Sequence, residues 1–378
     1  MKLLVDENIS HASEAFSGFG SVSLMHGRKI SNSALKDKDA LIVRSITKVN
    51  EELLKDTPVK FVGTATIGTD HIDLDYLSRR GIYFSDAKGC NADAVAEYVF
   101  TAIFRLAVEH GFSVKDKTIG VVGVGNIGSR IVRLAKSLGM NVLMNDPPLQ
   151  RKSGSAEFVP LKDIYSADII TLHVPLNKEG IDKTVHLFSE DNLSLLKENT
   201  VFINASRGQV VDNQALLKLL DKKNLNVVLD VWENEPRISL ELLKKVKFGS
   251  PHIAGYSLEG KVNGTVMIYN ALCKFLNRES GWKPELPSVD NPVIEASQDN
   301  NLEAALNKIF TSIYNIKDDD DLMRKMFNMN NEEAGTYFDS LRKNYKLRRE
   351  FANYTVKLTK LDEKLSGILK SFRFNVTD

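Results

Sequence analysis

Three ionisable side chains follow predicted strands in the second half of the chain. Arg207 lies in NASRG, Glu235 in DVWENEP and His252 in PHIAGY. Taken singly, they could be a surface cation, a solvated acid and a core histidine. The carboxyl ends of parallel strands meet at one edge of a sheet, so the three are expected to converge there. An arginine that grips a carboxylate, a histidine that accepts a proton and an acid that orients the histidine are what hydride transfer from a hydroxy acid requires.

A glycine-rich loop could hold the hydride acceptor. The run TIGVVGVGNIG places Gly123, Gly125 and Gly128 in the G-x-G-x-x-G spacing, after a predicted strand and before a helix predicted over 126–138. Such glycines permit a tight turn, let the backbone approach a pyrophosphate and let the helix pack against the strand. The helix N-terminus would then receive the pyrophosphate. Glycines also cluster in ordinary turns, so the spacing alone leaves that alternative open.

Asp146 favours the interpretation of the glycine loop as a dinucleotide site. It follows a second apolar run, residues 140–144, and lies 18 residues beyond Gly128. A carboxylate at that position accepts hydrogen bonds from ribose hydroxyls and repels a 2′-phosphate, which favours NAD over NADP. The alternative is a turn aspartate that precedes two prolines.

Composition limits the classes of protein to which this chain can belong. Its 378 residues predict two or three domains, and 43% hydrophobic with 26% charged residues is typical of a globular protein. A net charge of +1 argues against nucleic acid or a membrane surface as the main partner. Two cysteines and seven scattered histidines indicate neither a disulfide framework nor a metal site. Asp6 interrupts the N-terminal apolar run too early for a signal peptide, and we expect a cytoplasmic protein.

The order of the predicted elements indicates an α/β fold with two doubly wound parallel sheets. Strands alternate with helices, as they do in parallel sheets. The first set of strands is predicted over 2–5, 40–43, 61–63 and 82–84, with helical stretches at 51–55 and 74–79. The second set is predicted over 119–122, 141–144, 168–172, 200–204, 226–230 and 247–249.

Two long apolar segments connect these sets of strands. Residues 92–109 are predicted to form a helix that is apolar on nearly all sides and is therefore buried, plausibly between two domains. Residues 257–276 are predicted to form a second such helix, which we expect to return the chain to the first sheet. The predicted domains are a flavodoxin-like domain (1–98 and 255–280), a Rossmann-type cofactor domain (99–254) and a small α+β C-terminal domain (281–378).

The C-terminal region is predicted to begin with a proline-containing linker over 277–300. An amphipathic helix follows from Leu302, and we interpret the acidic run 318–321 as a solvated turn or helix cap. Apolar residues alternate over 354–358 and 372–376, which indicates a strand, a helix and a strand. So short a region buries little apolar surface by itself, and we expect it to pack against the body of the protein or against a second chain.

The chain resembles the D-isomer-specific 2-hydroxyacid dehydrogenases over about residues 1–280. The resemblance rests on GVGNIG, NASRG, DVWENEP and PHIAGY. Further stretches, GTATIGTDHID, KGCNADAVAEYVF, NDPP and HIAGYSLEGK, resemble one member of the family, and FDSLRKNYKLRRE resembles that member's dimerisation domain. The resemblance implies NAD as the cofactor, a phosphorylated hydroxy acid as the substrate, separate substrate and cofactor domains, and a homodimer formed through the C-terminal domain.

The same resemblance assigns expected roles to individual residues. Arg207, Glu235 and His252 match the catalytic triad. Positions that match substrate contacts are Ser45, Thr66 and Tyr256. Val174 departs from the family pattern because a hydroxyl residue is common there, and Ser206 stands where relatives often have cysteine. The positions expected to contact the cofactor are Gly123, Gly125, Asn126, Ile127, Gly128, Asp146, Val174, Ala205, Ser206, Asp230 and Gly255.

Charge alone nominates further ligands for a substrate phosphate. They are Arg44, at the end of a predicted strand, and the basic run formed by Lys346, Arg348 and Arg349. For the basic run, a solvated helix or loop face is the favoured interpretation.

Two other functions are compatible with these motifs. One is a different D-2-hydroxyacid dehydrogenase, of the phosphoglycerate or glyoxylate type, because the triad does not separate the members of the family. The other is an NAD-sensing binding module that resembles the C-terminal-binding corepressors and keeps the same scaffold and triad. The chain has neither a nuclear signal nor a disordered tail of the kind that such a module would need.

Overall fold

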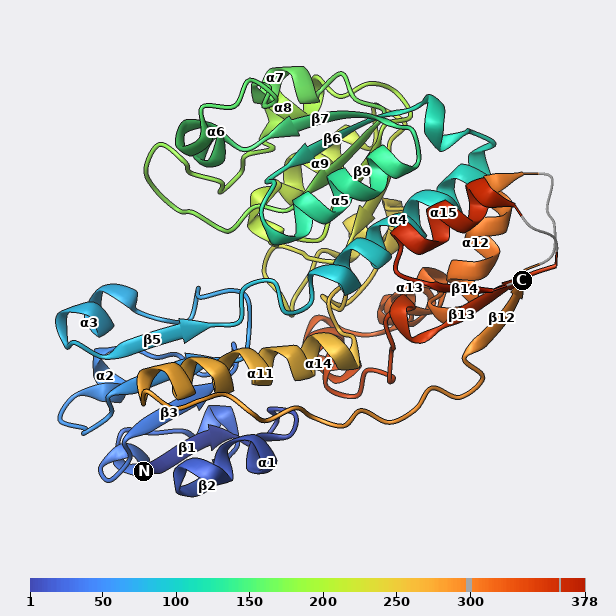
Figure 1. The fold of residues 1–378 in the computed structure, drawn as a ribbon. Coiled ribbons are helices and arrows are strands. Elements are labelled where there is room, and N and C mark those ends of the chain that lie inside the picture. Colours follow the sequence, from blue (N-terminus) through green and yellow to red (C-terminus); the bar gives the residue numbers. More distant parts are fainter. Residues whose placement is uncertain (297–300, 360–361, 378) are drawn as a thin grey trace. The chain divides into compact units, whose positions relative to one another are not determined.

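The computed structural model describes residues 1–296, 301–359 and 362–377. The chain divides into two compact units, one formed by Met1–Asn91 with Ser257–Ser288 and the other by Ala92–Tyr256 with Val289–Asp378 (Figure 1). The first unit is therefore discontinuous in sequence. No helix in the described ranges combines the length and the apolar character needed to cross a membrane. The three-domain division with the boundaries given above stays a prediction.

The first unit contains a five-stranded parallel sheet in the order β2-β1-β3-β4-β5, which is the flavodoxin-like order. Four of its strands were predicted to within about two residues, and β2 was missed. Because β2 is an edge strand whose sequence, SVSLM, alternates small polar with apolar residues, it lacks a continuous apolar run. The strands are β1 (Lys2–Asp6), β2 (Ser21–Met25), β3 (Ala40–Val43), β4 (Phe61–Thr64) and β5 (Tyr83–Asp86).

Helix α11 (Leu258–Phe275) packs on this sheet and belongs to the first unit. Its buried residues Ile268 and Leu272 join a core cluster with strand residues such as Leu3. Gly63 on β4 permits this packing, because a Cβ there would lie only 2.6 Å from Ile268 Cγ2. The shorter helices of this unit are α1 (Ala12–Phe16), α2 (Glu51–Leu54) and α3 (Leu74–Arg79).

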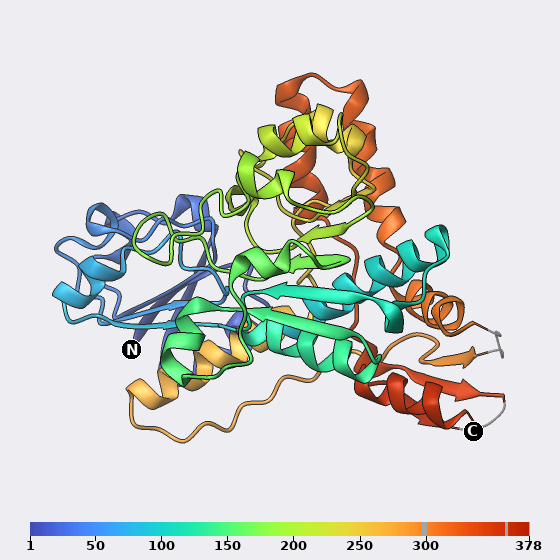
Figure 2. The same cartoon turned by 90° about the horizontal axis from the view of Figure 1, so that it is seen from above.

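The second unit contains a six-stranded parallel sheet in the order β11-β10-β9-β8-β6-β7. Figure 2 shows strands of this sheet, in teal and green, running alongside one another. All six strands were predicted from their apolar runs. The order reverses between β6 and β8, and ligands of doubly wound sheets bind beyond the carboxyl ends of the strands at such a reversal. The strands are β6 (Thr118–Val122), β7 (Asn141–Asn145), β8 (Ile169–Leu172), β9 (Val201–Asn204), β10 (Asn226–Leu229) and β11 (Phe248–Gly249).

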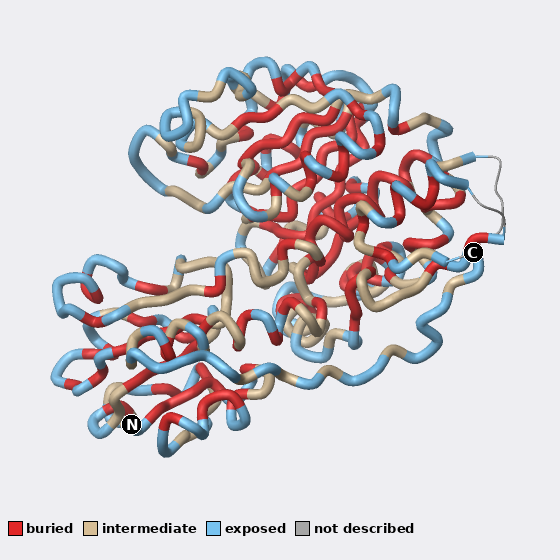
Figure 3. Tube along the Cα trace, viewed as in Figure 1, coloured by how far each residue is buried: buried red, intermediate tan, exposed pale blue. Residues whose placement is uncertain are grey.

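Helix α4 (Ala92–His110) is the centre of the larger core of the second unit. Fourteen of its nineteen residues are buried, and its trace is buried along most of its length in Figure 3. Helices from two parts of the unit pack on α4. Helix α5 (Asn126–Ser137) does so from the six-stranded sheet, which we call the cofactor sheet, and α12 (Leu302–Ile313) does so from the C-terminal region. Phe104 meets Phe310 edge to face, with ring centroids 5.3 Å apart. Neighbours within its own unit thus account for a helix that is apolar on nearly all sides.

Within its described residues, the C-terminal region adds a three-stranded parallel sheet and four α-helices. The predicted order of strand, helix and strand at the end of the chain is confirmed by β13, α15 and β14. Strand β12 corrects the expected linker over 277–300, and α14 was not predicted. The elements are β12 (Val293–Ala296), β13 (Thr355–Leu358), β14 (Asn375–Thr377), α12, α13 (Ile316–Arg324), α14 (Asn331–Lys343) and α15 (Glu363–Ser371).

The acidic run 318–321 lies within helix α13, so its interpretation as a solvated turn or cap was wrong. Asp319 and Asp320 are buried, with exposed fractions of 1% and 4%. The helical period turns these two carboxylates inward and leaves Asp318 and Asp321 exposed. In the sequence, four consecutive acidic residues suggest that all of them are solvated. Only the tertiary contacts show that Asp319 and Asp320 are buried whereas Asp318 and Asp321 are exposed.

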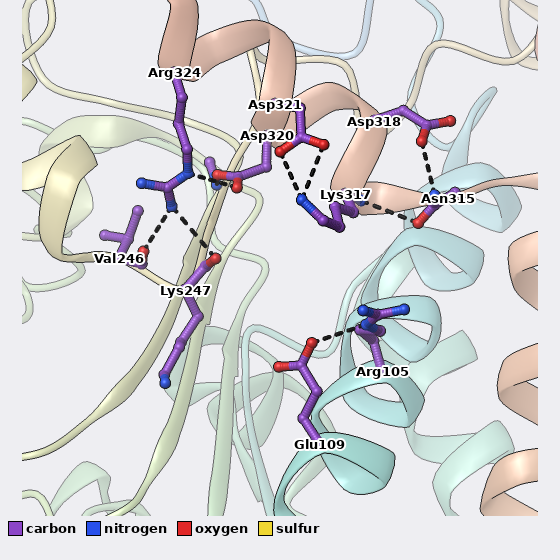
Figure 4. Close-up of polar contacts among 11 residues, drawn as sticks. Arg105, Glu109, Val246, Lys247, Asn315, Lys317, Asp318, Asp320, Asp321 and Arg324 are labelled. Carbon is purple, nitrogen blue, oxygen red and sulfur yellow. Dashed lines mark hydrogen bonds and ion pairs between the residues drawn. The ribbon is translucent and has the colours of Figure 1, made fainter. Parts of the chain in front are cut away.

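Asp320 fastens α13 to the edge of the cofactor sheet (Figure 4). One carboxylate oxygen accepts the backbone N–H of Gly249 on β11 at 2.8 Å, and the other accepts Arg324 Nε at 2.7 Å. Arg324 also donates to the Val246 carbonyl, at 3.0 Å, and to the Leu243 carbonyl, at 3.3 Å. Burial raises the pKa of Asp320 even though these donors favour its charged form.

Replacing Asp320 by alanine should lower the free energy of unfolding by about 2–4 kcal/mol, because a buried N–H and an arginine both lose their acceptor. Asp321→Ala is the matched control: its carboxylate pairs with exposed Lys317 at 2.7 Å (Figure 4), and the loss should stay below about 1 kcal/mol. Equilibrium denaturation of both variants measures the difference. Equal losses would show that Asp320 does not fasten α13 to the sheet.

Candidate active site

The glycine loop begins where β6 ends. Gly123 has a φ of +86°, and a Cβ there would lie 2.6 Å from the carbonyl oxygen of His173 and 2.9 Å from Val174 Cγ1. Both the backbone conformation and the space therefore require glycine at this position. The Val174 side chain thus lies against the glycine loop. The family resemblance predicts that Val174 contacts the cofactor.

The other two glycines shape the start of helix α5. A Cβ on Gly128 would overlap the Gly123 carbonyl oxygen, so only glycine lets the helix approach the loop. Gly125 is the N-cap, and no side chain caps the helix. A Cβ on Gly125 would meet nothing within 4 Å, so open space lies in front of the first N–H groups of the helix. This arrangement fits a pyrophosphate, which needs room and unpaired donors.

Asp146 combines two structural roles at the end of β7. One carboxylate oxygen accepts the Val124 N–H of the glycine loop at 2.8 Å, and the other accepts the Leu149 N–H at 2.9 Å, which caps helix α6 (Pro147–Ser153). Asp146 thus caps a helix, which agrees with its alternative interpretation as a turn aspartate. A carboxylate oxygen can accept a second hydrogen bond, so these contacts leave capacity for ribose hydroxyls.

Arg207 lies in the loop that follows β9. The Asn204 side chain shapes this loop, because its amide donates to the Arg207 carbonyl at 2.9 Å and its oxygen accepts from Ser206 N–H and Oγ. Arg207 donates to the Ser206 carbonyl at 2.8 Å. A Cβ on Gly208 would overlap the Trp232 carbonyl, so the loops after β9 and β10 pack backbone against backbone.

Asp230, at the end of β10, organises the loop that carries His252. Its carboxylate is almost completely buried and accepts three hydrogen bonds: from Ser250 Oγ at 2.6 Å, from Ile253 N–H at 2.8 Å and from Ala254 N–H at 3.0 Å. Its carbonyl accepts the His252 N–H at 2.7 Å. One side chain thus fixes a turn of five residues.

His252 and Glu235 are hydrogen-bonded to each other. His252 Nδ1 lies 2.8 Å from Glu235 Oε2, and the other oxygen of Glu235 accepts the Trp232 N–H at 2.8 Å. His252 has a φ of +58°, which the turn fixed by Asp230 imposes. Burial raises the pKa of Glu235. The adjacent His252 and the Trp232 N–H lower this pKa by more than burial raises it, so the net shift is downward. With Nδ1 bonded to a carboxylate, Nε2 is the ring nitrogen oriented for proton exchange.

Two buried residues that sequence reasoning missed support this turn. The Tyr98 hydroxyl on α4 lies 2.8 Å from Ser250 Oγ, which in turn donates to Asp230. Trp232 Nε1 donates to the Ser250 carbonyl at 3.0 Å. Nothing in the sequence pairs a tyrosine of an apolar helix with a serine about 150 residues later.

The basic run of the C-terminal region is mostly internal, which corrects its interpretation as a solvated face. Arg348 is 3% exposed and donates to the Ala254 and Ala94 carbonyls at 3.0 and 2.8 Å. Arg349 is also buried, whereas Lys346 is exposed and pairs with Asp318. Arg348 therefore links the His252 turn to helix α4 through its two terminal nitrogens.

The expected substrate positions of the first unit lie at the carboxyl ends of two adjacent strands. Arg44 and Ser45 follow β3, and Thr66 follows β4. Thr66 Oγ1 lies 2.7 Å from Thr64 Oγ1, and Arg44 donates to the Asn8 carbonyl at 3.3 Å. The pKa of nearby Lys261 is lowered, first by burial and then by the charge of Arg44, so two cations lie close together in this unit.

A separate hollow of about 430 Å³ lies at the opposite, amino-terminal ends of the cofactor sheet. Asp168, Thr200 and Asn226 are among the residues that line it. Doubly wound sheets bind their ligands at the carboxyl ends of the strands. The candidate active site is therefore at the glycine loop and the strand-end motifs, and not in this hollow. Within the described ranges, no three His, Cys, Asp or Glu side chains form a group that could hold a metal ion.

Comparison with known proteins identifies the same regions. The family model described as "D-isomer specific 2-hydroxyacid dehydrogenase, NAD binding domain" matches residues 95–254, and one described as "Domain of unknown function (DUF3410)" matches 286–370. The chain is 47% identical over 360 residues to the erythronate-4-phosphate dehydrogenase of Photorhabdus laumondii, covering 94% of each chain. It is 45% identical over 382 residues to that of Proteus mirabilis, covering 100% of each.

Solved structures of the family share the fold over about three quarters of the chain. The D-lactate dehydrogenase of Aquifex aeolicus, complexed with NAD and lactic acid, is 26% identical with a TM-score of 0.61, over 73% of this chain and 96% of its own. The NAD-bound 3-phosphoglycerate dehydrogenase of Entamoeba histolytica is 25% identical with a TM-score of 0.63, over 73% and 95%. The chain therefore belongs to the D-isomer-specific 2-hydroxyacid dehydrogenase family, has its NAD-binding domain, and has erythronate-4-phosphate dehydrogenases as full-length relatives.

Proposed function

We propose that this chain oxidises 4-phospho-D-erythronate to (R)-3-hydroxy-2-oxo-4-phosphooxybutanoate with NAD, a step of pyridoxal 5′-phosphate synthesis. The observation that carries the proposal is identity of 45–47% to erythronate-4-phosphate dehydrogenases over 94–100% of both chains. That identity includes the C-terminal region, whereas the solved lactate and phosphoglycerate dehydrogenases cover only 73% of the chain. The hydrogen-bonded His252 and Glu235 supply the proton acceptor that such an oxidation needs.

The roles proposed for the three ionisable residues follow from their chemistry. Arg207 grips the C1 carboxylate of the substrate through its planar fork and polarises the C2 oxygen. His252 Nε2 accepts the C2 hydroxyl proton, and Glu235 keeps the ring oriented and stabilises the imidazolium that results. NAD, when bound, accepts the hydride that leaves C2.

The proposed cofactor contacts surround the glycine loop and the strand ends beside it. The N–H groups at the start of α5 receive the pyrophosphate, and Asp146 accepts hydrogen bonds from the ribose. Asp230 contributes by shaping the turn that immediately precedes Gly255. The full proposed set is Gly123, Gly125, Asn126, Ile127, Gly128, Asp146, Val174, Ala205, Ser206, Asp230 and Gly255. Because Val174 has no hydroxyl, its contact with the cofactor is made through the backbone.

The proposed substrate contacts come from both compact units of the chain. Ser45 and Thr66 donate hydroxyl hydrogen bonds, and Tyr256 does so from the turn after His252. Arg44 is proposed to bind the substrate's phosphate group, which its proximity to the cation Lys261 supports.

The direct test is an assay with NAD and candidate substrates, followed at the absorbance of NADH. We expect turnover of 4-phospho-D-erythronate with kcat/KM at least about 100-fold above that for 3-phosphoglycerate or a glyoxylate-type hydroxy acid, a ratio within reach of a few specific polar contacts. Turnover of 3-phosphoglycerate alone would reassign the substrate. NAD binding without turnover of any hydroxy acid would favour the corepressor-like module.

The variant His252→Asn tests whether that turnover takes place at the proposed site. Asparagine tolerates the φ of +58° at this position, so the turn should persist. Loss of the general base should lower kcat by about 10²–10⁴-fold while the dissociation constant for NAD changes little. A variant with near-normal kcat would remove His252 from the mechanism.

We also propose that the protein is a cytoplasmic homodimer associated through its C-terminal domain. The C-terminal region folds onto α4 of its own chain, through contacts such as Phe372 against Phe100 with ring centroids 5.1 Å apart. A dimer would therefore use the outer surface of this region. Sedimentation equilibrium at micromolar concentration should give twice the chain mass of 42.2 kDa. A single-chain mass under those conditions would contradict the proposal.

A further inference from the structure

Arg342 reaches the turn that carries His252 from the C-terminal region. It lies in the last turn of α14, and one terminal nitrogen donates to the Tyr256 hydroxyl at 3.2 Å. Its guanidinium carbon lies 5.8 Å from the centre of the Tyr256 ring. The Tyr256 N–H donates to the Ile253 carbonyl at 2.8 Å, so this tyrosine belongs to the same turn as His252. Sequence reasoning did not single out Arg342.

Most of the hydrogen-bonding capacity of this guanidinium is unused. A guanidinium has five N–H donors, and among the described residues Tyr256 is the sole hydrogen-bond acceptor for Arg342. Its Nε is buried without an acceptor. The Nε of Arg348 is buried without an acceptor as well, so this atom does not by itself mark a ligand site. The Arg342 side chain is only partly buried, and its second terminal nitrogen, which has no acceptor among the described residues, stays accessible to a ligand.

Two other arginines of the same region use both terminal nitrogens within the protein. Arg324 donates from Nε and from both terminal nitrogens to Asp320 and to backbone carbonyls. Both terminal nitrogens of Arg348 donate to backbone carbonyls, and only its Nε has no acceptor. These two arginines hold the fold together. Arg342 differs from them because only one of its terminal nitrogens donates to an acceptor among the described residues.

The charges around Arg342 keep it protonated and link it to the catalytic pair. Burial lowers its pKa, but Tyr256 and the negative charges of Glu235 and Asp230 raise it more, and the net shift is upward. Arg342 in turn helps to lower the pKa of Glu235. The guanidinium therefore acts within electrostatic range of the His252 and Glu235 pair as a permanent cation.

We infer that Arg342 is a specificity-determining residue that binds the phosphate group of the substrate. The inference rests on the proposed function, whose substrate carries two anionic groups. Arg207 is assigned the carboxylate, and the three phosphate oxygens can accept hydrogen bonds from a second planar array of donors in addition to Arg44. Arg342 offers such an array next to Tyr256, itself a proposed substrate contact. The C-terminal region thereby completes the substrate site from within its own chain.

Arg342→Gln tests this assignment, with Lys343→Gln, an exposed neighbour on the same helix, as the matched control. We expect Arg342→Gln to raise KM for 4-phospho-D-erythronate about 10–100-fold, the effect of losing charge-assisted hydrogen bonds. KM for unphosphorylated D-erythronate and the dissociation constant for NAD should change less than about 3-fold. Arg342→Lys, which keeps the charge without the fork, should lie between wild type and Arg342→Gln.

Two outcomes would overturn the inference. Equal increases in KM for both substrates would show that Arg342 acts by positioning Tyr256 or Glu235, and an unchanged KM for the phosphorylated substrate would show that it does not bind phosphate. A wild-type protein that fails to oxidise 4-phospho-D-erythronate would refute the proposed function instead. In that case, thermal stabilisation by inorganic phosphate in wild type and its absence in Arg342→Gln would still support Arg342 as an anion ligand, and equal stabilisation of both proteins would refute it.

Discussion

The buried carboxylate of Asp230 is the constraint on which the candidate active site depends. It accepts hydrogen bonds from Ser250, Ile253 and Ala254 and thereby closes the turn that holds His252. A buried carboxylate is costly unless donors surround it, so the turn and the charge require each other. The His252 side chain is positioned by this turn, and Glu235 then fixes which ring nitrogen faces the reaction. The glycine loop has the complementary role of leaving space for the cofactor on the same edge of the sheet.

The C-terminal region braces the same turn from another direction. Arg348 donates to the Ala254 carbonyl, and Asp320 accepts the Gly249 N–H one residue before Ser250. The solved lactate and phosphoglycerate dehydrogenases cover 73% of this chain and almost all of their own length, so this chain is longer than those family members. The role in substrate selection that we propose for Arg342 is consistent with a region that contacts the turn of His252.

Apolar runs and glycine spacing predicted most of the fold, because central parallel strands are buried on both faces and bear a strong compositional signal. The missed strands, β2 and β12, lie at sheet edges and mix polar with apolar residues. The strand-end motifs also predicted that His252 and Glu235 lie together, and their side chains are hydrogen-bonded. Their supports could not be predicted: Tyr98 bonding to Ser250, two of four consecutive aspartates turned inward, and Arg342 directed at Tyr256 all depend on tertiary packing between distant segments.

The central claim is that His252 and Glu235 act as one acid–base unit during oxidation. The pH dependence of kcat/KM in wild type and Glu235→Gln tests it most directly. Oxidation needs a neutral imidazole, so the wild-type rate should rise with pH to a plateau. Glu235 stabilises the imidazolium that forms during oxidation, so its loss should lower this plateau by about 10-fold or more. An unchanged plateau in Glu235→Gln would contradict the account.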